Sequence, residues 1–184
     1  MLNTADRQQN LINYSVSGGR LNAYRAVRRA IDPWQWEQPV WTSATNDHGT
    51  ITASGVYAEN TIHGAFNGIL GGGTNQWGVR SRSGWIQLTL NYDIIIDSII
   101  FYNRFSGSSH RTRVAGFTGR NGVSLGAQFT AVNSNFGRTV INVGSVQTNI
   151  IRLNIASSYS PVLGHCFVGA AGIVIIARPA GLTR

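Results

Sequence analysis

Four basic side chains surround one serine- and glycine-rich segment, and their types suit them to bind a ligand. Arg104 precedes the segment 106–109, and His110, Arg111 and Arg113 follow it. A guanidinium donates paired hydrogen bonds to carboxylates or phosphates and stacks on rings. Because loops on a rigid scaffold often carry function, we predict a ligand-binding loop here. The structural alternative for Arg104 is an ion pair or a hydrogen bond to a carbonyl.

Two tryptophans allow a binding and a structural interpretation. Trp77 can offer its indole face to a ligand or pack beneath the loops as a large core residue. Trp85 lies on the strand face opposite Ile86 and Leu88, and we expect it to pack in the core.

The charge of the chain favours anionic partners in general. Lys and Arg total 15 against 7 acidic residues, a net charge of +8, and every basic residue is arginine. The basic residues are spread out and form no block typical of a nucleic-acid arm. Acidic glycans, lipopolysaccharide or an acidic protein surface are therefore candidate partners, and nucleic acid is not expected.

Residues suited to catalysis are few. Asp93 and Asp97 are four positions apart, which on a strand is about 13 Å and too far for the carboxylate pair of a glycosidase. The lone Cys166 excludes an intramolecular disulfide and is expected to be a small buried hydrophobe. We therefore predict that the protein is not an enzyme.

Residues 41–184 are predicted to form one all-β domain. Charged residues are only 12% of the chain and hydrophobic residues 42%, with 22 glycines, a composition typical of short strands joined by turns. Clean alternation predicts a strand at 84–90, and the β-branched run 94–103 predicts a central strand buried on both faces. The pattern indicates an antiparallel β-sandwich or jelly roll. The other strands are expected at 50–57, 111–117, 128–132, 139–143, 149–155 and 167–177.

Residues 1–40 are predicted to be an arm with a short amphipathic helix. Apolar residues recur there at helical spacing, with arginines around them. Such an arm docks either on its own domain or on a partner. The docking residues would be Leu21, Tyr24, Arg25, Val27 and Arg28.

The sequence also resembles the coagulation factor 5/8 C-type, or discoidin, domains. The resemblance implies a galactose-binding-like jelly roll whose loops at one end bind glycans or lipid head groups. It is carried, in the family's order, by Ala53–Tyr57, Ala65–Gly68, Thr74 with Trp77, Gly84–Leu90, Ile96–Ile99 and Tyr102–Arg104.

Within that resemblance, Arg104 and Arg111 are similar to the paired basic residues of the F-type lectin motif that binds fucose. Ser106 stands where that motif has Asp, and Trp77 stands where it has His. The resemblance implies two guanidiniums at one loop mouth beside an aromatic face. That arrangement suits sugars, because arginine hydrogen-bonds hydroxyls while the ring covers apolar C–H groups.

A structural calcium ion is the one cofactor that the resemblance implies. Several discoidin domains hold calcium beside the motif in which Asn67 replaces Asp here. The replacement removes a charge from the site, and backbone carbonyls would have to supply more of the ligands.

The sequence offers two settings for such a domain. It has no apolar run long enough to span a membrane and no secretory signal, which together with the arm favours a bacteriophage virion protein, with an extracellular or cell-surface location as the alternative. The first hypothesis is a module that binds a host glycan or lipopolysaccharide. The second is a structural decoration or adaptor subunit that packs on other virion proteins through its arm. Either would work as a homo-oligomer or within a larger assembly.

Overall fold

The computed structural model describes residues 36–107, 110–160 and 166–180 of the chain. The predicted helical arm falls largely on residues 1–35, and its docking residues Leu21, Tyr24, Arg25, Val27 and Arg28 lie outside the described residues. The described elements are the strands β1 (Thr45–Asn46), β2 (Gly49–Ala53), β3 (Trp77–Val79), β4 (Gly84–Tyr102), β5 (Thr112–Thr118), β6 (Phe129–Thr130), β7 (Arg138–Ser158), β8 (Val168–Ala170) and β9 (Gly172–Pro179), with the short 3-10 helices η1 (Gly64–Phe66), η2 (Gly73–Asn75) and η3 (Arg120–Gly122).

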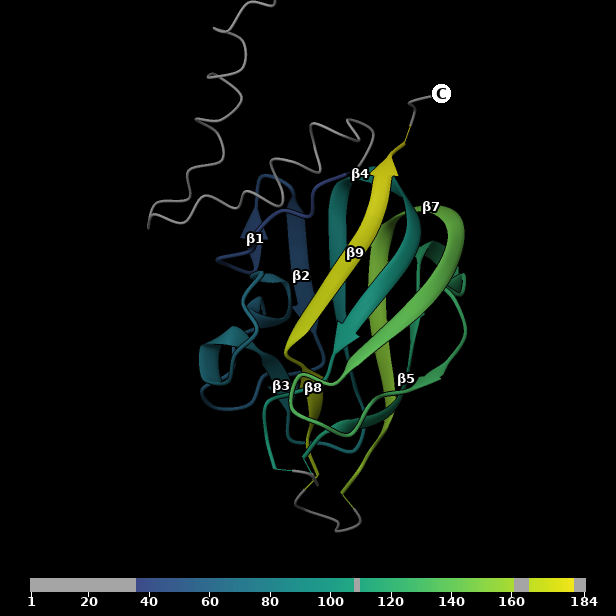
Figure 1. The fold of residues 1–184 in the computed structure, drawn as a ribbon. Coiled ribbons are helices and arrows are strands. Elements are labelled where there is room, and N and C mark those ends of the chain that lie inside the picture. Colours follow the sequence, from purple (N-terminus) through teal and green to yellow (C-terminus); the bar gives the residue numbers. More distant parts are fainter. Residues whose placement is uncertain (1–35, 108–109, 161–165, 181–184) are drawn as a thin grey trace, which may run out of the picture. The chain divides into compact units, whose positions relative to one another are not determined.

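Two long strands build both layers of an antiparallel sandwich. The first half of β4 pairs with β2 and its second half with β9, while β7 pairs with both halves. The β4–β7 register shifts between Thr89 and Ile94 and again between Ile96 and Ser98, and such irregularities let a strand bend sharply. Figure 1 shows β4 and β7 curving over one end of the sandwich. The predicted antiparallel all-β sandwich is confirmed.

The core lies between the layers and follows the alternation of the strands. Ile86 and Leu88 of β4 have no exposed surface. The expectation that 94–103 is buried on both faces is wrong, because Ile95 and Ile100 point to the outer face and are half-buried. A strand that bends between two solvated layers has one inner face only.

Several predicted strand boundaries differ from the structure. The expected strands 84–90 and 94–103 belong to the single strand β4, and the strand expected at 50–57 ends at Ala53. The segments 139–143 and 149–155 belong to the single strand β7, and 167–177 divides into β8 and β9. A bent strand keeps its backbone pairing across irregular positions, so it is longer than its alternating segments suggest.

Described residues that precede the predicted domain boundary at 41 contact the sandwich. The Trp36 amide donates to Ala177 O at 2.8 Å. The Gln38 side chain bonds the backbone of β9 at Ile173 and Ile175. This segment therefore lines the edge of β9. Among the described residues no helix is long and apolar enough to cross a membrane.

Candidate functional site

Asn103 fixes the turn that carries the predicted binding residues. It follows β4 and is fully buried. Its amide group donates to Thr112 O at 2.8 Å and to Val132 O at 3.0 Å. Its Oδ1 accepts the backbone N–H groups of Arg104 and Thr112. With these four bonds the side chain is satisfied, and it holds the start of the Arg104 loop against the start of β5.

The side chain of Arg104 lies over a pair of glycines. Gly78 of β3 and Gly169 of β8 face each other in the two-stranded sheet. A Cβ at Gly78 would come within 2.9 Å of Arg104 Cζ, and one at Gly169 within 2.9 Å of Arg104 Cδ. The absence of side chains at both positions therefore leaves the space that the arginine occupies.

The guanidinium of Arg104 is buried, and no carboxylate of the described residues pairs with it. Arg104 is 5% exposed. Nη1 donates to His110 O at 3.5 Å, and the buried Nε has no hydrogen-bond partner. Burial lowers the pKa of Arg104 to about 10, and the interaction with Tyr57 acts in the opposite direction. An incompletely paired buried cation is costly to stability, which is typical of a group kept for binding.

An aromatic cluster lies beside Arg104. The Phe167 ring centroid is 4.7 Å from the rings of both Tyr57 and His110. Arg104 Cζ is 5.6 Å from the Phe167 centroid. Tyr57 is 38% exposed, whereas Phe167 is 9% exposed. Tyr57 is thus the ring that a ligand can reach, and sequence reasoning overlooked it although it ends the motif Ala53–Tyr57. We call Tyr57, Arg104, His110 and Phe167 the Arg104 cluster.

Trp77 is not a ligand platform, which corrects the binding interpretation. Its side chain has no exposed surface, and its Nε1 donates to Gly55 O at 2.9 Å. The structural alternative holds, because a residue of this size on a short strand fills the space beneath the loops.

Arg111 clamps two loops instead of presenting a free guanidinium. It is 7% exposed. Nη2 donates to Ser106 O at 2.6 Å and to Asn135 Oδ1 at 2.8 Å, and Nη1 donates to Asn133 Oδ1 at 3.1 Å. These bonds occupy its terminal nitrogens, so Arg111 is placed to hold the loops, and direct binding of a ligand by Arg111 stays a prediction.

Arg113 is exposed but lies apart from the Arg104 cluster. Its side chain lies near Tyr159, whose ring centroid is 6.0 Å from Arg113 Cζ. Tyr159 in turn donates to Ala131 O. Of the predicted binding residues, the structure brings together Arg104 and His110 only.

Asn67 closes the turn that follows η1. It is 7% exposed; its Oδ1 accepts the Ile69 amide at 2.9 Å, and its Nδ2 donates to Asn75 Oδ1 at 3.0 Å. Residues 36–107, 110–160 and 166–180 contain no group of three His, Cys, Asp or Glu that could hold a metal. A calcium ion here would need carbonyl ligands, and it stays a prediction.

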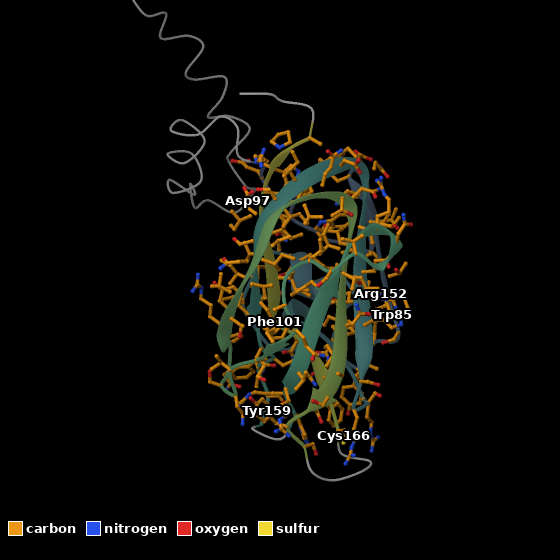
Figure 2. The ribbon with its side chains drawn as sticks, turned by 90° about the vertical axis from the view of Figure 1, so that its right-hand side faces the viewer. Trp85, Asp97, Phe101, Arg152, Tyr159 and Cys166 are labelled. Carbon is orange, nitrogen blue, oxygen red and sulfur yellow. The ribbon has the colours of Figure 1, made fainter. Side chains whose placement is uncertain are left out.

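Cys166 is buried, as expected, beside the residues that begin β8. Arg82 Nε donates to its Sγ at 3.3 Å. Burial raises the pKa of the Cys166 thiol, but hydrogen bonds and the positive charge of Arg82 lower it by more. Figure 2 shows Cys166 and Tyr159 at one end of the sandwich and Asp97 near the other.

Comparison with solved structures supports the fold at low sequence identity. A module from Clostridium perfringens in complex with GalNAc-β-1,3-galactose superposes with a TM-score of 0.56 at 14% identity, over 69% of this chain and 93% of that one. A pectin-binding carbohydrate-binding module superposes with a TM-score of 0.56 at 18% sequence identity, over 76% of this chain and 98% of that one. An F5/8 type C domain from Bacteroides fragilis superposes with a TM-score of 0.56 at 17% sequence identity, over 74% of this chain and 97% of that one.

These structures define the class of the fold. It is the β-sandwich of family 32 carbohydrate-binding modules and F5/8 type C domains. Neither a protein-family model nor a curated protein sequence matches the chain.

Proposed function

We propose that this chain is a non-catalytic glycan-binding module whose binding site is the Arg104 cluster. The observation that carries the proposal is the buried guanidinium of Arg104, which lies next to the exposed ring of Tyr57 and has no carboxylate partner among residues 36–107, 110–160 and 166–180. Support from the fold comes from similar structures, among them modules in complex with galactose and with GalNAc-β-1,3-galactose and a pectin-binding module.

The cluster has the two groups that sugar recognition needs. The guanidinium of Arg104 donates hydrogen bonds to hydroxyl or ring oxygens. Tyr57 covers the apolar C–H face of the ring, and His110 adds a titratable donor or acceptor at the rim. Because the Arg104 stem is confined by Gly78 and Gly169, the guanidinium loses little freedom when a ligand binds.

The proposed function involves no catalytic role for Asp93 and Asp97. Asp93 is paired with Arg120, with 2.5 Å between its Oδ1 and Nη2, and Asp97 with Arg178 at 3.8 Å. The two carboxylates that the sequence singled out therefore have structural partners, and Asp97 lies near the end of the sandwich away from Cys166 (Figure 2).

The first test is an array of glycans and lipopolysaccharides probed with the full chain, with and without calcium, at moderate salt. We expect selective hits that Arg104→Ala abolishes. Arg113→Ala is the matched control, because it removes an exposed arginine from the same β5 region and is expected to keep the hits. Hits that disappear uniformly as salt rises would contradict the proposal and indicate a polyanion patch.

The proposed setting is the surface of a virion, with the module facing a host glycan or lipopolysaccharide. The support is the arm predicted at residues 1–40, whose amphipathic pattern suits docking on neighbouring virion proteins, in a homo-oligomer or a larger assembly. The alternative is a purely structural decoration subunit. A blank array from folded protein, with assembly lost on deletion of residues 1–33, would favour that alternative.

A further inference from the structure

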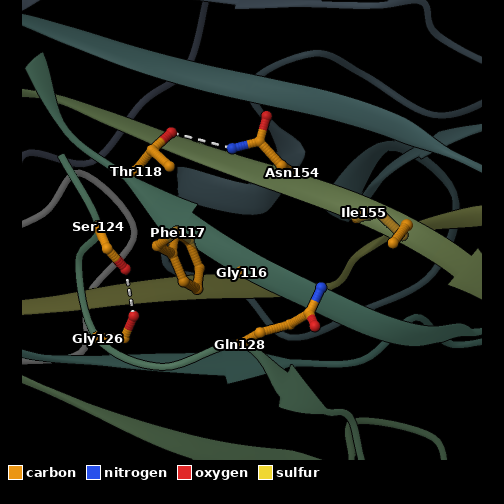
Figure 3. A pocket seen from close by; sticks show the side chains of 9 residues that line it. Gly116, Phe117, Thr118, Ser124, Gly126, Gln128, Asn154 and Ile155 are labelled. Carbon is orange, nitrogen blue, oxygen red and sulfur yellow. Dashed lines mark hydrogen bonds between the residues drawn. The ribbon is translucent and has the colours of Figure 1, made fainter. Parts of the chain in front are cut away.

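A cavity of about 320 Å³ opens on the outer face of the sheet formed by β5 and β7. It shares no residue with the Arg104 cluster. Figure 3 shows Gln128 and Ser124 on the segment beside it and Thr118 and Asn154 on the strands. The lining residues are Gly116, Phe117, Thr118, Ser124, Gly126, Gln128, Asn154, Ile155 and Ala156.

Gly116 creates the floor of the cavity. It pairs with Asn154 of β7, which in turn pairs with Trp85 of β4. A Cβ at Gly116 would lie 3.7 Å from Gln128 Cα and 3.9 Å from Gln128 Cβ, which is ordinary contact. The position therefore tolerates a side chain, and its absence keeps the hollow open.

A chain of polar contacts runs from the cavity to Arg152. Asn154 Nδ2 donates to Thr118 Oγ1 at 3.0 Å, as Figure 3 shows. Arg152 Nε donates to Asn154 Oδ1 at 3.0 Å. The side chain of Arg152 is thus tied to the rim of the cavity.

Trp85 fixes the plane of that guanidinium. Arg152 Cζ lies 4.0 Å from the centroid of the Trp85 ring, a close cation–π contact. Figure 2 shows the two residues side by side on one flank of the sandwich. The core position expected for Trp85 is wrong, because its ring is half-buried on the outer face.

The terminal nitrogens of Arg152 are available to a ligand. Within the described residues they make no hydrogen bond, and the recorded ion pairs join Arg120 to Asp93 and Arg178 to Asp97. Stacking on Trp85 and the hydrogen bond of Nε already restrict the Arg152 side chain. Binding of a carboxylate to its two terminal nitrogens therefore costs little further conformational entropy.

We propose that this face is a second ligand site, which binds a sugar that carries a carboxylate group. The fork of Arg152 matches the carboxylate. The glycine floor accepts a ring, and the Thr118 hydroxyl and the Gln128 amide face it with hydrogen-bonding groups for its hydroxyls. The net charge of +8 attracts an anionic saccharide. The proposal does not depend on the Arg104 cluster.

The test uses the full chain and two forms of one probe, a tetragalacturonate and its methyl ester, measured by calorimetry. We expect the free acid to bind roughly tenfold more tightly than the ester. Arg152→Gln should remove that preference. Arg138→Gln, which removes the same charge from an exposed position of the same strand, should leave it intact, and so should Arg104→Ala.

A second variant tests the cavity itself. Gly116→Val fills the floor with a residue that suits a strand and should weaken both probes roughly tenfold. If that variant loses more than about 4 °C in melting temperature, Gln128→Leu replaces it. That change removes an exposed amide and should weaken both probes severalfold.

Three outcomes overturn the proposal. One is a folded wild-type chain that does not distinguish the acid from the ester. Another is equal weakening by Arg138→Gln and Arg152→Gln, which would mean a diffuse charge effect. The third is loss of the preference in Arg104→Ala, with NMR shifts from the acid at Tyr57 and His110 instead of at 116–128 and 152–156, which would assign the sugar to the Arg104 cluster.

Discussion

Arg104 and Arg152 are held by opposite means, and the difference separates the two regions of this sandwich. Arg104 is 5% exposed and lies over two glycines with its Nε unpaired. Arg152 is half-buried on the outside of a sheet, where the ring of Trp85 and the amide of Asn154 orient it. Burial of Arg104 at the loop end costs the protein the desolvation of a charge, whereas the charge of Arg152 on the sheet face stays in contact with water. Removing each arginine should therefore weaken binding in its own region only, and stability should change only when Arg104 is removed.

The largest expected effect is on the Arg104 cluster. Arg104→Met should weaken glycan binding roughly 100-fold, because it removes the buried donor. The same change should raise the free energy of unfolding by about 1 kcal/mol, since it relieves an unpaired buried group. Glycan titration and urea unfolding measure the two effects.

Arg113→Met is the control for this change, because that arginine is exposed on β5. It should alter neither binding nor stability. A fall in stability with Arg104→Met as large as the binding loss would show that Arg104 is a structural residue.

The next effect comes from the link between β5 and β8. Thr112 is fully buried; its Oγ1 donates to Gly169 O at 2.8 Å and accepts the Gly169 amide at 3.0 Å. Thr112→Val keeps the shape but leaves both backbone groups unpaired, at a cost of about 2 kcal/mol in thermal unfolding.

This substitution also separates the regions. Binding at the Arg104 cluster should weaken with Thr112→Val, because Gly169 borders the Arg104 stem, while the acid preference of the sheet face persists. Thr52→Val, at an exposed position of β2, serves as the control and should stay within about 0.5 kcal/mol of wild type.

A smaller effect is expected from Gly78→Ala. The new Cβ would fall 2.9 Å from Arg104 Cζ and 3.0 Å from its Nε, so the flexible end of the side chain must shift. Glycan affinity should drop roughly tenfold, and the melting temperature should change little. A crystal structure of the variant with Arg104 unmoved would contradict this steric explanation.

The smallest effect is a pH dependence specific to the loop end. Burial lowers the pKa of Arg104 to about 10, below its value in the unfolded chain, so the cost of burying the charge is fully present below about pH 10. That cost is relieved as pH rises through this window, because the unfolded state then binds more protons. The stability advantage of Arg104→Met over wild type should narrow between pH 9 and 11, roughly the span of this pKa, in parallel urea titrations.

The pattern of apolar residues was enough to predict the sandwich. The alternation at 84–90 placed Ile86 and Leu88 correctly in the core, and turn residues correctly indicated short antiparallel elements. The strand breaks were less predictable. β7 continues past a bulge at 143–145, because its backbone pairs with β4 on both sides of that bulge, at Asn142 and again from Val146.

The residues of the proposed binding site were only partly predictable. Arg104 and His110 were found because the sequence places them around one loop, and that signal equally suggested Arg111 and Arg113. Tyr57 and Phe167 lie far from that loop in the sequence, and only the folded chain brings their rings together. Asn103 lies within the motif Tyr102–Arg104, so the sequence could have indicated it. Its four hydrogen bonds, however, depend on groups from three segments of the chain.

The sequence by itself determined the class of fold, through its periodicity, and the number of arginines available for binding, through its composition. Both are properties that do not depend on how the chain folds. Tertiary structure alone decided which guanidiniums are free. The same side chain became a loop clamp at Arg111, an unpaired buried cation at Arg104 and a stacked fork at Arg152. The physical reason is that the hydrogen-bond partners and burial of a long side chain are set by neighbours distant in the chain, such as Gly78, Asn135 and Trp85.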